Sequence, residues 1–163
     1  MCSFEEYLNE ELDKPTAIIV SGISASGKST WADAYVKDNI NTKEINRDMI
    51  RNIIFKELNP NKQFSWKLWS FKNEPEVTKR HREEILKASK SKNNIVISDT
   101  NLDKKFNKQL EDCLIELGFR IERKWFDVPL ETCLERDAKR DNPVGEEVIR
   151  NQFKKYQELK ASL

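Results

Sequence analysis

A glycine-rich loop that ends in lysine and serine lies between an apolar segment and a segment with helical character. Residues 16–21 read Thr-Ala-Ile-Ile-Val-Ser, a short apolar run typical of a buried strand. The pattern G-x-x-x-x-G-K-S/T follows at once, as Gly22-Ile23-Ser24-Ala25-Ser26-Gly27-Lys28-Ser29. A helix is predicted over residues 28–37, with Trp31, Ala34 and Tyr35 on one side. This strand–loop–helix unit predicts a parallel α/β sheet with the loop at its carboxyl edge.

Each residue type in the loop suits phosphate binding. Successive N–H groups in such a turn form a nest for oxyanions, and the following helix adds its positive end. Gly22 and Gly27 let the backbone bend close to a ligand, Lys28 offers a mobile charge to the β and γ phosphates, and the Ser29 hydroxyl can bind Mg²⁺. A chance turn is the alternative, and the flanking elements disfavour it. The predicted nucleotide site comprises Gly22, Ser24, Ala25, Ser26, Gly27, Lys28, Ser29 and Thr30.

Strands and helices alternate along most of the remaining sequence. Further strands are predicted over residues 44–46, 94–98 and 119–128, and helices over 47–58, 74–91, 103–117, 130–140 and 145–160. The apolar face predicted for the helix over 47–58 is Met49, Ile50, Ile53 and Ile54. No repeat or long linker divides the chain. We therefore predict an α/β P-loop NTPase/kinase fold over residues 15–163, with helices flanking both faces of a parallel sheet.

Residues 1–14 are predicted to form an acidic helical extension. Ser3 and Glu6 fit a capping box, and Phe4, Leu8 and Leu12 follow at helical spacing. The first 13 residues carry five acids and no base, so the rest of the chain has 29 basic against 23 acidic residues. A basic body suits an anionic substrate such as a nucleotide or nucleic acid. Taken alone, however, the charge composition is explained better by an ordinary solvated surface of mixed charge than by an anion-binding surface.

Cellular location is predicted from what the sequence lacks. The chain has no apolar run long enough to span a membrane, and its start lacks the regions of a signal peptide. The three cysteines, Cys2, Cys113 and Cys133, form no CxxC pair, which favours a reducing, cytoplasmic compartment. His81 is the only histidine, which argues against structural zinc, and no role is assigned to it.

Three groups of charged residues are candidates for chemistry, each with a simpler alternative. Asp99 ends the apolar strand over 94–98, so it is either a Walker B partner or a cap for the next helix. Asp48 and Arg51 share a helix face. In a kinase, Asp48 could accept the proton of the attacking hydroxyl and Arg51 could bind an anionic acceptor. The alternative is an ordinary surface ion pair between them. Arg136 and Arg140 share a face near the C-terminal end of a predicted helix. They either form a lid over the transferring phosphate or are simply cations stabilised by the helix dipole.

Four blocks of sequence resemble the N-terminal kinase domain of the bacteriophage 5′-polynucleotide kinases. The match extends over about residues 16–155, and its blocks are residues 22–32, residues 45–51 (Ile-Asn-Arg-Asp-Met-Ile-Arg), residues 97–102 (Ser-Asp-Thr-Asn-Leu after Ile) and residues 126–140. The Walker motif is generic, whereas the other blocks are specific when taken together. The resemblance implies transfer of the ATP γ-phosphoryl group, with Mg²⁺, to the 5′-hydroxyl end of DNA or RNA.

The resemblance also implies residue roles. Lys28 and Ser29 hold the phosphates and Mg²⁺, and Arg140 with Arg136 closes over the donor. Asp48 is the general base, and Arg51 grips the phosphate on the 3′ side of the accepting nucleotide. The remaining acceptor positions are Arg47 and Val144, which flank the terminal base, and Asp99 and Thr100, which line the acceptor side.

The sequence departs from that family in three ways. It shows no Asp-x-Asp phosphatase motif, so 3′-end repair is not expected of this chain, and a separate phosphatase or ligase is a candidate partner, as is a second copy of the chain. Ala25 replaces the usual middle glycine, which predicts a stiffer loop. The aromatic segment 60–75 is poorly matched, and helix packing is favoured over base stacking for it.

Two rival functions share the phosphate loop. A P-loop kinase of a small molecule, such as a nucleoside or sugar, would need a closed acceptor pocket instead of an open basic channel. A nucleotide-dependent switch or motor would hydrolyse nucleotide without phosphorylating an acceptor, and the sequence has no Asn-Lys-x-Asp guanine motif.

Overall fold

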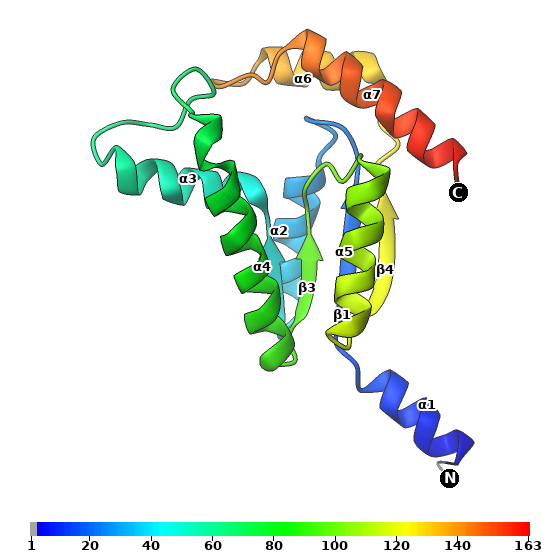
Figure 1. Cartoon of the computed structure of the whole chain (residues 1–163). Helices are drawn as coiled ribbons and strands as arrows, with labels where there is room; N and C mark the ends of the chain where they lie inside the picture. The colour runs from blue at the N-terminus through cyan, green and yellow to red at the C-terminus, as the bar shows by residue number, and fades with distance from the viewer. Residues whose placement is uncertain (1–2) are drawn as a thin grey trace.

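A computed structural model describes residues 3–163 as a parallel sheet with helices on both faces (Figure 1). Met1 and Cys2, the start of the predicted extension, lie outside the described residues. The strands are β1 (Thr16–Ser21), β2 (Thr42–Ile45), β3 (Asn94–Ile97) and β4 (Arg120–Trp125). The helices are α1 (Phe4–Leu12), α2 (Lys28–Asp38), α3 (Arg47–Leu58), the short 3₁₀ helix η1 (Phe71–Asn73), α4 (Glu74–Lys90), α5 (Lys104–Glu116), α6 (Leu130–Ala138) and α7 (Glu146–Ala161).

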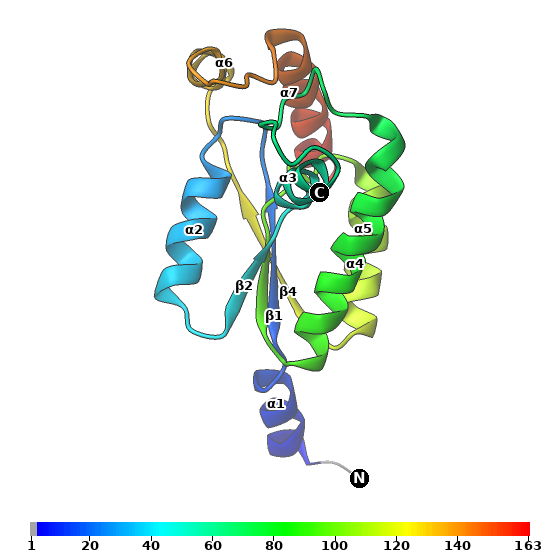
Figure 2. The same cartoon turned by 90° about the vertical axis from the view of Figure 1, so that its left-hand side faces the viewer.

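All four strands are parallel and lie in the order β2-β3-β1-β4. Ile18 of β1 pairs with Val96 of β3 on one side and with Glu122 of β4 on the other. Helix α2 covers one face of the sheet, and α4 and α5 cover the other (Figure 2). Because parallel strands end at one edge, the loops that follow them gather there, and α6 and α7 lie across that edge (Figure 1). The predicted fold class is confirmed.

The central strand β1 has no polar face because both of its sides are buried. Ala17 and Ile19 belong to the cluster that α4 and α5 close, whereas Ile18 and Val20 belong to the cluster with Ala32 of α2. Successive side chains of a strand point to opposite faces, and helices cover both faces of this sheet. Each fully buried aliphatic side chain stabilises the fold by about 1.5–3 kcal/mol. This double burial accounts for the continuous apolar run in the sequence.

Strands β2, β3 and β4 all differ from their predicted extents, β3 only by ending at Ile97, and β2 and β4 by more. Strand β2 begins at Thr42 and ends at Ile45, because it pairs with β3 from Asn94 onwards. It is an edge strand with polar residues at its centre, so it carries a weak apolar signal. Strand β4 ends at Trp125, opposite Ser21, because its partner β1 turns into the loop there. Residues 126–129 therefore lie outside the sheet.

The packed faces of two helices also differ from the prediction. In α3 the buried residues are Ile50, Ile54 and Phe55, whereas Met49 and Ile53 are exposed. In α2 it is Ala32, not Ala34, that is buried. The aromatic segment packs as favoured: Phe64, Trp66 and Trp69 join the buried face of α3 and Val77 of α4. Packing therefore turns α3 toward α4, which places the first turn of α3 beside the first turn of α4.

Helix α1 projects away from the sheet (Figure 1). The Ser3–Glu6 capping box is formed, yet none of its residues is buried, and Phe4, Leu8 and Leu12 are exposed. Cys113 is exposed and Cys133 is buried, and both are free thiols. Within residues 3–163, no helix combines the length and the apolar character that a bilayer crossing requires.

Candidate active site

The glycine-rich loop connects β1 to α2 at the carboxyl edge of the sheet (Figure 1). The Gly22 N–H donates to the Thr100 carbonyl at 3.2 Å, which ties the loop to the end of β3. A Cβ at Gly22 would lie 2.8 Å from Phe126 Cβ and 2.9 Å from Ser26 Oγ, so no other residue fits there. Gly27 has φ of +94°, a left-handed conformation that favours glycine. Both glycines thus shape the turn.

The middle of the loop is held by residues from the last two helices. Ala25 has φ of +62°, so its methyl group is accepted in a conformation that L-residues disfavour. That methyl is buried in the cluster with Cys133 and Ile149, which offsets part of the strain. Arg136 Nη1 donates to the Ala25 carbonyl at 3.4 Å, and the Ser24 N–H donates to Gln152 Oε1 at 2.8 Å. The loop is therefore preorganised from α6 and α7.

Lys28 lies inside the loop with 7% of its surface exposed. Its ammonium group donates to the Ile23 carbonyl at 2.6 Å. Burial, together with the charge of Arg140, lowers the pKa of Lys28 to about 8, although the charges of Asp48 and Asp99 oppose the change. Within the described residues, the buried Ser26 hydroxyl has no hydrogen-bond partner. A buried cation and an unpartnered hydroxyl beside a bent backbone are the groups that a bound phosphate would satisfy.

An open cavity of about 580 Å³ adjoins the loop. Ser29 and Thr30 form the exposed first turn of α2, and Thr30 lines this cavity. Arg140 was predicted on a helix face with Arg136, but α6 ends at Ala138, so Arg140 follows the helix. Both arginines nevertheless line the cavity, which is bounded by Ala25, Gly27, Thr30, Trp31, Ala34, Arg136 and Arg140. The cavity thus joins the phosphate loop to two cations.

The first turn of α3 presents Asp48 and Arg51. Asn46 caps this helix, because its side-chain oxygen accepts from the N–H groups of Asp48 and Met49. The Asp48 carboxylate is 65% exposed and accepts from Arg51 Nη1 at 2.5 Å. The predicted ion pair is therefore present. This ion pair does not exclude a catalytic role, because the Asp48 carboxylate stays exposed to solvent and its charge acts on the pKa of Lys28.

Glu74, at the start of α4, joins the two arginines of the predicted acceptor side. Its carboxylate accepts from Arg51 Nε at 2.8 Å, from Arg51 Nη2 at 3.0 Å and from Arg47 Nη2 at 3.1 Å. Trp69 Nε1 donates to the same carboxylate at 3.0 Å. The ring of Trp66 lies 5.6 Å from the Arg51 guanidinium carbon. Glu74 was not predicted from the sequence, because an acid in the first turn of a helix is common and its two arginine partners lie 23 and 27 residues away.

Asp99 lies two residues beyond β3, because the strand ends at Ile97 and not at Ser98 as predicted, and Thr100 follows it at the loop contact. Asp99 Oδ1 accepts from the Arg47 N–H at 2.8 Å, which links the ends of β2 and β3. His81 is buried in α4, and its Nε2 lies 3.3 Å from Asp99 Oδ2 without hydrogen-bond alignment. No sequence pattern assigned a role to His81. A lone histidine among charged residues carries no pattern that predicts this contact.

The loop between α6 and α7 carries Val144. The buried Asp137 carboxylate accepts from the Val144 N–H at 3.1 Å and from the Gly145 N–H at 2.9 Å. Arg140 Nη1 lies 3.6 Å from the same carboxylate. Asp137 therefore fixes the start of α7 and the backbone at Val144, and it restrains Arg140 near the cavity.

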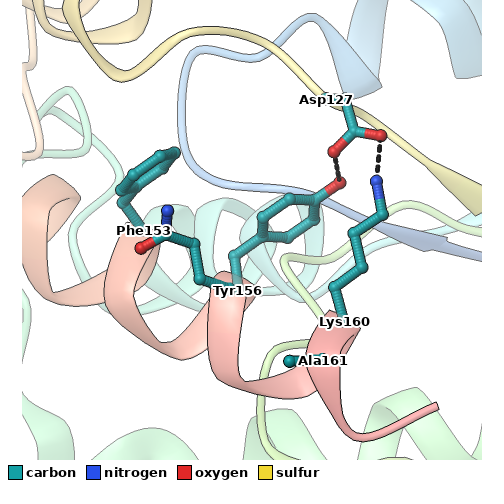
Figure 3. Close-up of a pocket in the computed structure, with 6 residues that line it drawn as sticks. Asp127, Phe153, Tyr156, Lys160 and Ala161 are labelled. Atoms are coloured by element: carbon teal, nitrogen blue, oxygen red, sulfur yellow. Dashed lines mark hydrogen bonds and ion pairs between the residues drawn. The ribbon is translucent and has the colours of Figure 1, made fainter.

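A second cavity, of about 380 Å³, lies against the C-terminal half of α7 (Figure 3). The Tyr156 hydroxyl donates to Asp127 Oδ1 at 2.7 Å, and Lys160 pairs with Oδ2 of the same carboxylate. Burial and the Asp127 contact raise the pKa of Tyr156. These contacts, which involve the Asp-Val-Pro block, clamp α7 to the loop after β4. The cavity shares no residue with the one beside the glycine-rich loop.

A Gly22→Ala substitution is expected to destabilise the chain by about 1–3 kcal/mol, because its methyl group would overlap Phe126 and Ser26. It should also remove the thermal stabilisation that added ATP gives. The matched control is Gly118→Ala, where only a positive φ of +86° opposes the methyl group and nothing lies within 4 Å. Thermal unfolding with and without ATP checks both variants. Equal loss of ATP stabilisation in the control would contradict a role for the close approach at Gly22.

The comparisons with known proteins agree with this geometry. A bifunctional polynucleotide kinase/RNA ligase of Autographa californica nuclear polyhedrosis virus is 36% identical over 146 residues, which cover 85% of this chain and 20% of that protein. An L-seryl-tRNA(Sec) kinase of Methanococcus maripaludis is 24% identical over 143 residues, 85% of this chain and 51% of that protein. A chain of the Pnkp1/Rnl/Hen1 RNA repair complex superposes with a TM-score of 0.71 at 24% identity, over 92% of this chain and 46% of that one.

This chain thus spans between a fifth and about half of the length of these relatives. The sequence profile of the AAA domain family AAA_33 matches residues 18–159, from β1 into α7. The chain therefore belongs to the AAA domain family AAA_33, and its glycine-rich loop is the phosphate-binding loop of a P-loop fold.

Proposed function

We propose that this chain transfers the γ-phosphoryl group of ATP to the 5′-hydroxyl end of DNA or RNA. One observation carries the proposal: Lys28 of the phosphate loop and Asp48 of α3 lie at one edge of the sheet, near enough for the Asp48 charge to oppose the lowering of the Lys28 pKa. A donor phosphate beside Lys28 then lies close to a carboxylate that can accept a hydroxyl proton. The 36% identity to the viral kinase/ligase supports this acceptor class.

On the donor side, ATP binds with its phosphates in the loop. Lys28 and the loop N–H groups contact the phosphate oxygens, and Arg136 and Arg140 neutralise the group in transfer from the adjoining cavity. Ser29 and the Asp99 carboxylate are oxygen donors of the kind that Mg²⁺ prefers. Within residues 3–163, no three His, Cys, Asp or Glu side chains form a candidate metal site. We propose an ion held largely by ATP phosphates and water. When bound, Mg²⁺ would neutralise phosphate charge.

On the acceptor side, Asp48 accepts the proton of the 5′-hydroxyl. The 5′ oxygen forms a bond to the γ phosphorus as the bond from phosphorus to the β–γ bridging oxygen breaks, and ADP leaves. Arg51 binds the phosphate on the 3′ side of the accepting nucleotide. Arg47 and Val144 flank the terminal base, and Asp99 and Thr100 line the acceptor side.

Transfer of labelled γ-phosphate to a panel of acceptors tests the proposal. The panel comprises 5′-hydroxyl DNA and RNA oligonucleotides, 3′-phosphorylated mononucleotides, nucleosides and sugars. We expect label on the oligonucleotides. Label on nucleosides or sugars but on no oligonucleotide would replace the proposal with a small-molecule kinase. Hydrolysis of ATP without a labelled acceptor would support the switch or motor class.

We also propose that the chain acts in a reducing cytoplasm beside a separate ligase or phosphatase, and that it can form a homo-oligomer. We also keep the division into an acidic extension, residues 1–14, and a kinase domain, residues 15–163. The absence of any buried residue in α1 supports that division.

Arg51→Ala is expected to raise the acceptor KM by about 10-fold or more while the ATP KM changes little, because a guanidinium fork holds two phosphate oxygens. Arg51→Lys should restore only part of the activity, since an ammonium group is a point charge. The measurement is steady-state kinetics on a 3′-mononucleotide and on a short oligonucleotide.

The control for this series is Arg80→Ala, which removes another ion-paired arginine, on α4. It should leave both KM values unchanged. A defect of Arg51→Ala confined to the ATP KM would remove Arg51 from the acceptor site.

A further inference from the structure

We propose that Glu74 is a positioning residue of the acceptor site: its carboxylate holds Arg51 in the orientation in which it meets the acceptor's phosphate, and it holds Arg47 beside Arg51. This inference rests on the proposed function and adds a residue from another helix to it. Arg51 and Arg47 lie in the first two turns of α3, whereas Glu74 begins α4. The contact therefore fixes the two helix ends against each other at the sheet edge.

The hydrogen bonds of Arg51 leave one part of its guanidinium group available. A guanidinium has five N–H groups. Nε and Nη2 each donate one to Glu74, and Nη1 donates one to Asp48. Two N–H groups, one on each Nη atom, remain for phosphate oxygens. Glu74 thus orients the guanidinium by its Nε–Nη2 edge, and one N–H on each Nη atom stays available for phosphate oxygens.

Glu74 is itself held rigidly. Trp69 is 5% exposed, and its Nε1 donates to the Glu74 carboxylate. The carboxylate lies at the N-terminal end of α4, where the helix dipole favours negative charge. The Trp66 ring covers the Arg51 guanidinium. Trp66 and Trp69 of the aromatic segment therefore hold Arg51 and its partner Glu74 in place.

The low pKa of Glu74 keeps its contact with Arg51 and Arg47 intact across the assay range of pH. Burial acts to raise the pKa of Glu74, but the hydrogen bonds and charges of Arg51, with Arg47 and Trp69, lower it to about 2. A lowered pKa means that the pair is intact above the ordinary carboxyl range and is lost only as the pH falls through about 2. The Glu74 contact therefore persists at every pH at which a kinase would be assayed.

The test compares two substitutions of the same chemistry. Glu74→Gln removes the charge that holds Arg51, and Glu57→Gln removes the charge of the Glu57–Arg80 pair, which joins the same two helices by two hydrogen bonds of 2.8 and 2.9 Å. We expect Glu74→Gln to raise the acceptor KM for a 5′-hydroxyl oligonucleotide by about 10-fold, with the ATP KM within about twofold of wild type. Glu57→Gln should change neither constant.

A double-mutant cycle separates positioning from stability. If Glu74 acts through Arg51, Glu74→Gln has little further effect on the acceptor KM in an Arg51→Ala background. Equal, additive effects in both backgrounds would overturn the inference. A lower acceptor KM in Glu74→Gln would also overturn it, because Glu74 would then compete with the phosphate. Glu74→Asp, which keeps the charge on a shorter side chain, should recover part of the loss.

Binding without turnover keeps this inference distinct from the proposed function. Calorimetric titration with a 3′-phosphorylated nucleoside should give a dissociation constant about 10-fold weaker for Glu74→Gln than for wild type and Glu57→Gln. Unchanged binding would remove Glu74 from the acceptor site even if the wild-type chain proves to be a kinase. Wild-type binding and transfer restricted to nucleosides would instead overturn the proposed acceptor class.

Discussion

Lys28→Ala is expected to reduce phosphoryl transfer by about 10³-fold while the chain stays folded. The ammonium group is buried within the phosphate loop, and it donates a hydrogen bond to the Ile23 carbonyl of that loop. A donor phosphate would replace this carbonyl as its partner, so the charge stabilises the transferring group. Transfer of labelled γ-phosphate to a 5′-hydroxyl oligonucleotide measures the loss, and circular dichroism checks the fold.

Lys37→Ala is the matched control, since it removes an exposed lysine from the last turn of the same helix. It should retain full activity. If Lys28→Ala kept near wild-type transfer with a normal fold, the loop would bind phosphate without taking part in catalysis. Loss of folding in Lys28→Ala is separated from loss of chemistry by Lys28→Met, which keeps the aliphatic stem.

The buried position of Lys28 also predicts a pH dependence of the ATP-free protein. Its pKa is lowered from 10.5 to about 8, mainly by burial. Between these values the unfolded chain holds a proton that the folded chain has lost, so this residue makes the free energy of unfolding rise with pH. Bound phosphate favours the charged form. ATP affinity should therefore weaken as the pH rises above 8, and Lys28→Ala should lack that dependence in calorimetry.

The sequence predicted most of the fold because its strongest signals come from short-range patterns. The apolar run at β1 reflects burial on both faces of the sheet. The alternation of strands with helices predicts a parallel sheet, because each helix returns the chain to the start of the next strand. Strand β2 was placed too late because its buried residues, Thr42 and Ile45, flank two polar ones at a sheet edge. The exposed Met49 and Ile53 misled the prediction for α3, because packing against α4 and the aromatic segment selects another face.

The donor loop was predictable for a different reason than the acceptor network. Eight consecutive residues define the loop, and each type has a conformational or chemical purpose that can be read locally. Glu74 and His81 meet their partners across 23 and 18 residues of chain, respectively, through helix packing. No periodicity signals such contacts. The ion pair of Asp48 with Arg51 was foreseeable from i, i+3 spacing, but the contact of Arg51 with Glu74 was not.

Asp48→Asn is expected to lower the transfer rate by about 10²-fold or more with little change in the ATP KM. The substitution keeps the shape of the side chain, but an amide cannot accept the hydroxyl proton. Because Asp48 is 65% exposed, the lost contact with Arg51 should cost at most about 1 kcal/mol of stability. Asp112→Asn, which removes an exposed aspartate paired with Lys108 on α5, should retain full activity. The rate is measured at saturating ATP and oligonucleotide, beside thermal unfolding. A shift in melting temperature with an unchanged rate would assign Asp48 to a surface ion pair, and the base would then have to be sought among the other carboxylates of this edge, Asp99 first.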